Sequence, residues 1–331
     1  MPPLTDKPTR TIKEILSPVE PYLRAVDEDI KLKLRTDVPL INDGAMHLFK
    51  SGGKMVRAAL VILSSGLKGP VPDKTVMIAG AAEIVHAATL IHDDIIDKAF
   101  LRRGDISVSE KWGNKVAVLV GDFMYTTGLD IVVCDGNPAL FPVIVAGTSD
   151  MVQGELYQLQ YSNIDSINEE HYFKIIELKT ARFMAACVKL GAVKASCPQK
   201  ECDELYSFGL NLGMAFQIID DMLDFTSIGS DTGKDASNDI IDGKITLPLL
   251  YLINRSTPED SKAVMEFCRN PNLESMPDII KRLENSGAFE FCREKATVYI
   301  NNALEILSPY PESKFKNVLI ELAHFFLYRK N

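Results

Sequence analysis

Apolar residues recur at three- and four-residue spacing along most of the chain, which is the pattern of helices that bury one face. Glycine and proline fall mostly between the patterned stretches, where helices end and turns begin. Strand-like runs are short and isolated. The sequence therefore predicts an all-α fold, and the clearest helical segments are 73–97, 114–133, 137–161, 168–190, 199–225 and 286–307.

The sequence shows no sign of a boundary between domains. It contains no Ser/Gly linker, low-complexity tract or repeat of fixed period. Some stretches are apolar on several faces, as in Ala-Ala-Glu-Ile-Val-His-Ala-Ala at 81–88, and such helices belong at the centre of a bundle. We therefore expect one all-helical domain over residues 1–331, in which the small residues either pack closely or leave an open channel.

The charge balance limits the possible ligands. Lys and Arg number 36 against 45 Asp and Glu, a net charge of −9, so a nucleic-acid partner is not expected. An anion could still bind at a local basic cluster or at a bound metal ion. The question is where such clusters lie.

The compartment follows from the cysteines and from the apolar stretches. The six cysteines form no CxxC pair, which favours buried thiols in a reducing compartment over a zinc site. The N-terminus lacks the apolar centre of a signal peptide. The most apolar stretch, Val76 to Ile91, contains Glu83 and His86 and is short for a bilayer. We expect a cytoplasmic protein without a transmembrane segment.

Two helical segments carry the same acidic motif, DDxxD. Carboxylates at i, i+3 and i+4 share one face of a helix and repel each other by roughly 0.2–0.5 kcal/mol per pair, a cost that a cation would reverse. One copy would be typical of a solvated face, but both copies lie in strongly apolar sequence, where carboxylates need a partner or a metal ion. Magnesium takes one or two carboxylates and shares phosphate oxygens, so the motifs predict a Mg²⁺ clamp for a diphosphate. Its candidate ligands are Asp93, Asp94, Asp97, Asp220, Asp221 and Asp224.

A diphosphate would also need cations nearby, and the sequence offers several. Each has a simple explanation when taken alone: a solvated face for Lys54 and Arg57, a core histidine for His86, an ion pair with Glu177 for Lys179. No P-loop is present. In chain order, however, the motifs are Gly52-Gly53-Lys54-x-x-Arg57, His86, Asp93-Asp94-x-x-Asp97, Arg102-Arg103-Gly104, Lys179-Thr180, Phe216-Gln217-x-x-Asp220-Asp221-x-x-Asp224, Gly233-Lys234-Asp235 and Gly243-Lys244.

This ordered set resembles the polyprenyl synthetase family, the farnesyl, geranylgeranyl and longer-chain diphosphate synthases, from about Gly52 to Pro248. The resemblance implies an isoprenoid synthase-type helical bundle around a central cavity, usually homodimeric. It also implies a Mg²⁺-dependent prenyltransferase that condenses an allylic diphosphate (dimethylallyl, geranyl or farnesyl) with isopentenyl diphosphate. Departures are mild: Met55-Val56 stands where the family often has Arg-Leu, and Ala58 where proline is common.

The resemblance also assigns roles by position. The two aspartate triads match the magnesium motifs. Lys179 and Lys244 match residues that stabilise the departing diphosphate. The isopentenyl diphosphate site is matched by Lys54, Arg57, His86 and Arg103. The allylic diphosphate site is matched by Arg102, Lys179, Thr180, Gln217, Lys234 and Lys244.

Product length depends on the residues that precede the first motif. Short-chain members of the family often carry aromatic residues there, whereas this chain has Ala88 and Thr89, on a stripe with Val85. We expect a product beyond farnesyl, from geranylgeranyl to octaprenyl. Phe123 or Met124 would then close the far end of the channel that holds the growing chain. Two alternatives stay open. A terpene cyclase of the same fold would lack the second intact DDxxD, and a non-catalytic regulatory subunit of a prenyl synthase would have lost aspartates.

Overall fold

The computed structural model describes residues 10–50, 53–102, 104–226, 244–272 and 274–329. The elements of the N-terminal half are α1 (Ile12–Leu16), η1 (Ser17–Val19), α2 (Glu20–Lys33), α3 (Pro39–Lys50), α4 (Val56–Ser65), α5 (Thr75–Ile96), β1 (Leu101–Arg102), β2 (Asp105–Ile106), α6 (Val108–Trp112), α7 (Asn114–Asp135) and α8 (Leu140–Gln160). Those of the C-terminal half are α9 (Glu169–Ile176), η2 (Glu177–Ala181), α10 (Arg182–Lys194), α11 (Gln199–Thr226), α13 (Leu247–Arg255), α14 (Pro258–Arg269), α15 (Met276–Ser286), α16 (Ala288–Leu307) and α17 (Lys314–Tyr328). The all-α prediction is confirmed, and the strands of the described residues form only a short antiparallel hairpin.

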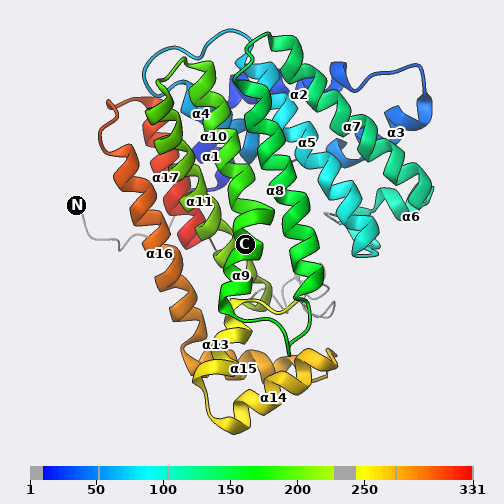
Figure 1. Cartoon of the computed structure of the whole chain (residues 1–331), viewed down its shortest axis with the longest axis vertical. Coiled ribbons are helices and arrows are strands. Elements are labelled where there is room, and N and C mark those ends of the chain that lie inside the picture. Colours follow the sequence, from blue (N-terminus) through cyan, green and yellow to red (C-terminus); the bar gives the residue numbers. More distant parts are fainter. Residues whose placement is uncertain (1–9, 51–52, 103, 227–243, 273, 330–331) are drawn as a thin grey trace.

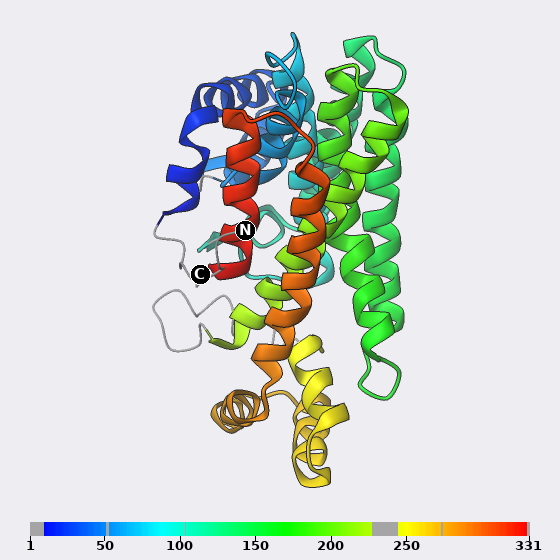
Figure 2. The same ribbon diagram turned by 90° about the vertical axis from the view of Figure 1, so that its left-hand side faces the viewer.

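The helices form a bundle in which α5, α10 and α11 have neighbours on several sides. Helix α5 packs against α7, α4 and α2, while α10 packs against α11, α4 and α8. Figure 1 shows α7 and α8 on the side of the bundle away from α16 and α17, with α13, α14 and α15 at its lower end. Figure 2 shows the same lower end from the side. One connected cluster of buried side chains runs from Ile15 to Leu327.

The six predicted helical segments all coincide with helices, with one interruption. Segment 168–190 is not one regular helix, because η2 between α9 and α10 is a π-helical turn. Two glycines face this turn. A Cβ atom on Gly154 of α8 would lie 2.7 Å from the backbone nitrogen of Lys179, and one on Gly213 of α11 would lie 2.5 Å from the Cα of Ala181. Glycine at both places therefore lets α8 and α11 close on the π-turn from two sides.

The apolar stretch Val76 to Ile91 proves to be part of a longer helix than its sequence suggested. By length and hydropathy alone, Thr75–Ile96 and Asn114–Asp135 could each cross a membrane, so shortness is not an argument against a transmembrane segment here. In α5, however, 67% of the most apolar window is buried inside the bundle, which is typical of a core helix. In α7 the figure is 39%, so much of the apolar surface of that helix is exposed.

Candidate active site

A cavity of about 1230 Å³ lies between α5, α8, α9, α10 and α11, and residues 244–246 complete its wall. Most of the predicted site residues reach it although they come from distant parts of the sequence. Those that line it are Arg57, His86, Thr89, Asp93, Asp97, Arg102, Lys179, Thr180, Gln217, Asp220, Asp221, Asp224 and Lys244.

Both aspartate motifs stand at the C-terminal ends of their helices. Asp97 is the C-cap of α5, and Asp224 precedes the end of α11 at Thr226 by two residues. The C-terminal end of a helix carries partial negative charge from its unsatisfied carbonyl groups, so carboxylates are unfavourable there and cations are favoured. Two helix ends with three carboxylates each therefore make this cavity strongly attractive to cations.

In the first motif, each aspartate has a different surrounding. Asp94 is buried, and its Oδ1 accepts hydrogen bonds from Nε of Arg102 at 2.7 Å and from Nη2 of the same guanidinium. Asp97 Oδ2 lies 3.2 Å from Nζ of Lys244. Lys244 thus reaches the first motif from 147 positions further along the chain. Arg102 and Lys244 are therefore close enough to the first motif to bind the oxygens of a diphosphate held there, in place of the aspartates that they contact now.

The protonation of Asp93 is strongly perturbed by its surroundings. Its pKa is raised to about 6, mainly by burial; the carboxylates of Glu155 and Asp97 also raise the pKa, whereas the charges of Lys179 and Arg102 lower it. Lys179 is itself ion-paired with Glu155, a buried residue of α8. Several carboxylates therefore crowd around one lysine, which is the environment that a divalent cation would relieve.

In the second motif, Asp221 is the buried member. Its Oδ2 accepts a hydrogen bond from the hydroxyl of Tyr172 at 2.7 Å, and its Oδ1 accepts one from Nε2 of Gln217 at 2.8 Å. The hydroxyl of Thr180 donates to Oε1 of Gln217 at 2.8 Å. Asp220 also lines the cavity and pairs with Arg329, whose Nη2 lies 2.7 Å from Oδ1 of Asp220.

The residues assigned to isopentenyl diphosphate divide into three groups. Arg57 and His86 line the cavity. The Nε of Arg57 is buried and has no hydrogen-bond partner among the residues that the structure describes, as expected of a guanidinium placed to receive an anion. Lys54 is exposed and does not line the cavity. Arg103, like Lys234 of the allylic site, lies outside the described residues.

The residues proposed to set product length do not all reach the cavity. Thr89 lines it, whereas Ala88 and Val85 are fully buried between helices. Val85 packs against α7, where a Cβ atom on Gly128 would lie 2.6 Å from its Cγ2. Phe123 is half-buried and Met124 buried, both on α7 and neither in the cavity wall. The small residues before the first motif therefore serve close packing in part.

The donor set fits a divalent cation that is shared with a ligand. Within the described part of the chain, no three acidic, His or Cys side chains come close enough to hold a metal ion by themselves. The buried, cation-seeking carboxylates nevertheless fit magnesium, which takes one or two carboxylates and completes its octahedron with water and phosphate oxygens. The motif carboxylates that line the cavity would hold the metal ions: Asp93, Asp97, Asp220, Asp221 and Asp224.

Several site residues carried no clear signal in the sequence. Glu155 could have been noticed as one of two acidic residues in α8, which is otherwise largely apolar. Tyr172, Phe183 and Phe216 line the cavity but resemble ordinary core aromatics. Arg329 could not have been predicted, because it reaches the second motif from just beyond the last helix of the chain.

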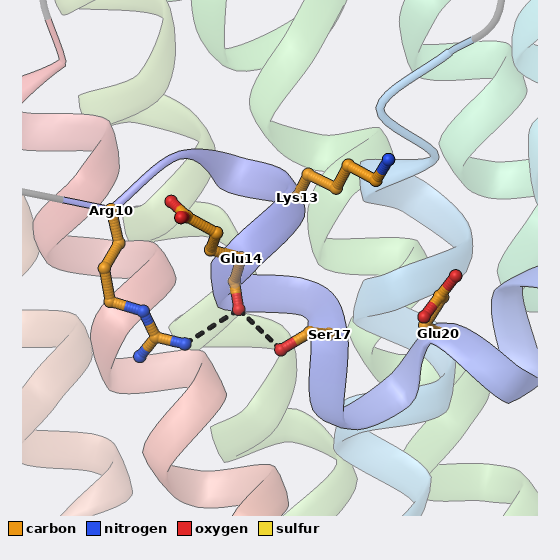
Figure 3. Close-up of a pocket in the computed structure, with 5 residues that line it drawn as sticks. All are labelled: Arg10, Lys13, Glu14, Ser17 and Glu20. Atoms are coloured by element: carbon orange, nitrogen blue, oxygen red, sulfur yellow. Dashed lines mark hydrogen bonds between the residues drawn. The ribbon is translucent and has the colours of Figure 1, made fainter.

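A second, smaller hollow of about 430 Å³ lies at the surface beside α1 (Figure 3). Its side chains are of mixed charge, and Lys13 and Glu20 point away from the others. Arg10 Nη2 and the hydroxyl of Ser17 both donate to the carbonyl oxygen of Glu14, at 2.8 and 2.7 Å. Arg10 also pairs with Glu321 of α17. These bonds attach the first helix to the last one, which is a structural role.

Comparison with known proteins agrees with this geometry. A family model described as polyprenyl synthetase matches residues 38–283. Octaprenyl diphosphate synthase of Escherichia coli (strain K12) is 32% identical over 308 residues, covering 93% of this chain and 95% of that protein. Heptaprenyl diphosphate synthase component 2 of Bacillus subtilis (strain 168) is 30% identical, covering 92% of this chain and 87% of that protein.

A solved structure gives the same fold. The polyprenyl synthase of Caulobacter crescentus CB15, complexed with calcium and isoprenyl diphosphate, superposes with a TM-score of 0.92 at 30% identity, covering 98% of this chain and 100% of the other. The chain belongs to the polyprenyl synthetase family. It is therefore a prenyltransferase of the all-α isoprenoid synthase fold, and the family depends on a divalent metal ion.

Proposed function

We propose that this chain is a Mg²⁺-dependent trans-polyprenyl diphosphate synthase that condenses an allylic diphosphate with isopentenyl diphosphate and releases diphosphate. The observation that carries the proposal is the pair of aspartate motifs at the C-terminal ends of α5 and α11, because five of their six carboxylates line one cavity together with Arg102, Lys179 and Lys244. Dimethylallyl, geranyl or farnesyl diphosphate would be the allylic substrate.

Bound magnesium would neutralise the allylic diphosphate as it departs. Lys179 and Lys244 supply fixed positive charge on the same side, since both contact the carboxylates around the first motif. Arg57 and His86 hold isopentenyl diphosphate, with Lys54 and Arg103 assigned to the same role from the sequence. The apolar wall, which includes Phe183 and Ile176, excludes water from the allylic cation.

The proposed product is longer than farnesyl. Two similar proteins are named octaprenyl and heptaprenyl diphosphate synthase, which supports a long product. Thr89, four residues before Asp93, lines the cavity, and its small side chain leaves room for a growing chain. The range from geranylgeranyl to octaprenyl therefore stays the proposal, with the longer end favoured.

The experiment is an assay of diphosphate release with isopentenyl and farnesyl diphosphates, each alone and together. A synthase releases diphosphate only when both are present with Mg²⁺. Release from the allylic substrate alone would indicate a terpene cyclase. No release under any of the three conditions would indicate a regulatory subunit. Chromatography of the dephosphorylated products then gives the chain length.

We further propose that the protein is a homodimer built on α7 and α8. These two helices expose large apolar side chains that a second copy could cover: Val118, Leu119, Val133, Phe141, Val152, Leu156 and Leu159. A heteromer is the alternative, because one similar protein is named as a component. Light scattering of Leu119→Glu tests the proposal, with Leu32→Glu on α2 as control, since Leu119 and Leu32 are 66% and 65% exposed.

Two expectations from the sequence also stay proposals. One domain over residues 1–331 is supported by the single connected core. A cytoplasmic location is supported by the cysteines, none of which is paired in the described residues. Protease digestion of the purified protein would test the first of these, and fractionation of cells would test the second.

A further inference from the structure

The contact between Tyr172 and Asp221 joins two buried polar side chains. Tyr172 is 2% exposed and Asp221 is 7% exposed, and 49 positions separate them in the sequence. A buried tyrosine hydroxyl needs a partner, but a neutral carbonyl group would serve. A buried carboxylate is a costly partner, because removing its charge from water is expensive unless several donors compensate. The pair therefore calls for an explanation beyond packing.

The donors on Asp221 come from different elements. Tyr172 on α9 donates to Oδ2, and Gln217, one turn earlier on α11, donates to Oδ1. Gln217 is fixed in turn by Thr180 of the π-turn, whose hydroxyl donates to its Oε1. Because that bond uses the amide oxygen, the amide NH₂ group faces Asp221. Both oxygens of the carboxylate are thus held by oriented donors, and its rotation is fixed.

The π-turn brings the two outer members of this network to the same side. Tyr172 and Thr180 are eight positions apart. In a regular α-helix that spacing turns through about 800°, which leaves two side chains about 80° apart. The π-turn Glu177–Ala181 is wider and turns less per residue, which reduces that offset. Both side chains therefore face α11, with Tyr172 at Asp221 and Thr180 at Gln217.

Asp221 differs in this respect from its neighbour in the motif. The side chain of Asp220 is 47% exposed and pairs with Arg329. Asp221 is the member whose direction is fixed by neutral donors, and it lines the cavity as well. Each carboxylate oxygen has a second lone pair, so the hydrogen bonds leave acceptor capacity for a ligand.

We propose that Tyr172 is a positioning residue of the second aspartate motif: its hydroxyl holds Asp221 in the direction needed to bind the Mg²⁺–diphosphate unit. Tyr172 acts through Asp221 and supplies no charge of its own. The inference rests on the proposed function, because it assigns a role within the metal and diphosphate site described above.

The test uses Tyr172→Phe, which keeps the buried ring and removes the one oxygen atom. The first readout is the increase in melting temperature caused by Mg²⁺ with inorganic pyrophosphate, which reports binding without turnover. We expect the half-saturating Mg²⁺ concentration to rise about tenfold and kcat to fall about tenfold, the lower end of the range typical of residues that support metal ligands. The KM for isopentenyl diphosphate should change less than about twofold. Tyr206→Phe, on α11 outside the cavity, is the matched control and should change none of these.

The decisive measurement is a double-mutant cycle with Asp221→Asn. If Tyr172 acts through Asp221, the Tyr172→Phe change has little further effect in the Asp221→Asn background. An equal loss in both backgrounds, or a lower melting temperature with unchanged Mg²⁺ dependence, overturns the proposal. Gln217→Met in the same two backgrounds repeats the test from the other carboxylate oxygen should Tyr172→Phe not fold. The wild-type enzyme is assayed alongside the variants. If the wild type itself transfers no prenyl group, the proposed function is contradicted, and this result is distinct from a failure of the role proposed for Tyr172.

Discussion

Nη2 of Arg329 lies 2.7 Å from Oδ1 of Asp220, although 109 positions separate the two residues in the sequence. The guanidinium group also stacks on Phe216, with its central carbon 4.2 Å from the ring centre, and donates to the carbonyl oxygen of that residue at 3.1 Å. The first aspartate of the second motif is therefore paired with a cation of the protein itself. Magnesium at this position would share or replace that cation.

Arg329→Gln should strengthen magnesium binding. Removing a positive charge next to Asp220 leaves the carboxylate more attractive to Mg²⁺, so we expect the half-saturating Mg²⁺ concentration to fall about threefold. The measurement is the melting temperature as Mg²⁺ is titrated with pyrophosphate. Arg24→Gln is the control, because Arg24 pairs only with exposed Glu20 on α2 among the described residues. A rise in the half-saturating concentration for Arg329→Gln would show instead that this arginine supports the metal ligand.

Loss of one aspartate from either motif should abolish most of the turnover. We expect Asp93→Ala or Asp220→Ala to lower kcat roughly a thousandfold, about 4 kcal/mol of barrier. The fold should survive, because the change removes like-charge repulsion at a helix end. Steady-state rates at saturating Mg²⁺ provide the measurement, with exposed Asp73→Ala as control. Near-normal turnover in either variant would contradict the assignment of the metal site.

The raised pKa of Asp93 predicts a dependence of stability on pH. Its folded value of about 6 exceeds the unfolded value of about 3.9, so the folded state binds more protons in between. Asp93 therefore contributes to the free energy of unfolding of the metal-free protein below about pH 4. This contribution is lost as the pH rises through about 6. In EDTA, Asp93→Asn should be more stable than wild type by roughly 1–2 kcal/mol at about pH 8, and the difference should shrink near pH 5. A constant difference across this range would mean that Asp93 titrates normally.

The two diphosphate subsites should respond to different substitutions. Arg57→Ala and Lys54→Ala should mainly raise the KM for isopentenyl diphosphate, because Arg57 lines the cavity beside His86. Lys179→Ala and Lys244→Ala should act on the allylic substrate and lower kcat by roughly a hundredfold, since both lysines contact the carboxylates around the first motif. Initial rates with each substrate varied in turn separate the effects, and Lys262→Ala on α14 is the control. Identical patterns for Arg57→Ala and Lys244→Ala would refute the division.

Product length should respond at Thr89 more than at Ala88. Thr89 lines the cavity, so Thr89→Phe should shorten the product while the first condensation continues. Ala88 is 1% exposed between helices, so Ala88→Phe should overpack the core and cost about 1–3 kcal/mol of stability. Chromatography of the dephosphorylated products and melting temperatures distinguish the two outcomes. An unchanged product from Thr89→Phe would place the growing chain elsewhere.

The helices that carry the chemistry could be predicted because their periodicity is strong and local. The predicted ends of the segments that contain Asp97 and Asp224 lie within about two residues of the observed ones, the usual uncertainty of helix ends. The aspartates themselves stand out because a charge in apolar sequence is costly and needs a reason. The ordered motifs then bring Lys179 and Lys244 into the same site, although their partners could not be named.

The partners could not be predicted because they depend on how distant helices pack. No local pattern indicates that Arg329 reaches Asp220, or that Tyr172 reaches Asp221. Position along a helix also misleads: Val85 and Ala88 share a stripe with Thr89, but α7 packs on that stripe and leaves Thr89 at the cavity. Which face of a buried helix is open is decided by its neighbours.

The π-turn at Glu177–Ala181 makes the site more sensitive to length than to composition. Upstream and downstream of it, the side chains follow two different angular phases, and the network on Asp221 needs both. Inserting one residue between Tyr172 and Thr180 would rotate everything before it by about 100° relative to everything after it, so Tyr172 would point away from α11 while Thr180 stayed in place. Deleting one residue there is different, because loss of the π-turn can absorb the change. Seven positions of a regular helix turn through about 700°, which leaves the two side chains about 20° apart. The loop 161–168 ahead of α9 can change length without rephasing either side. Engineering of this enzyme by insertion thus has a natural place to begin and a segment that must not gain a residue.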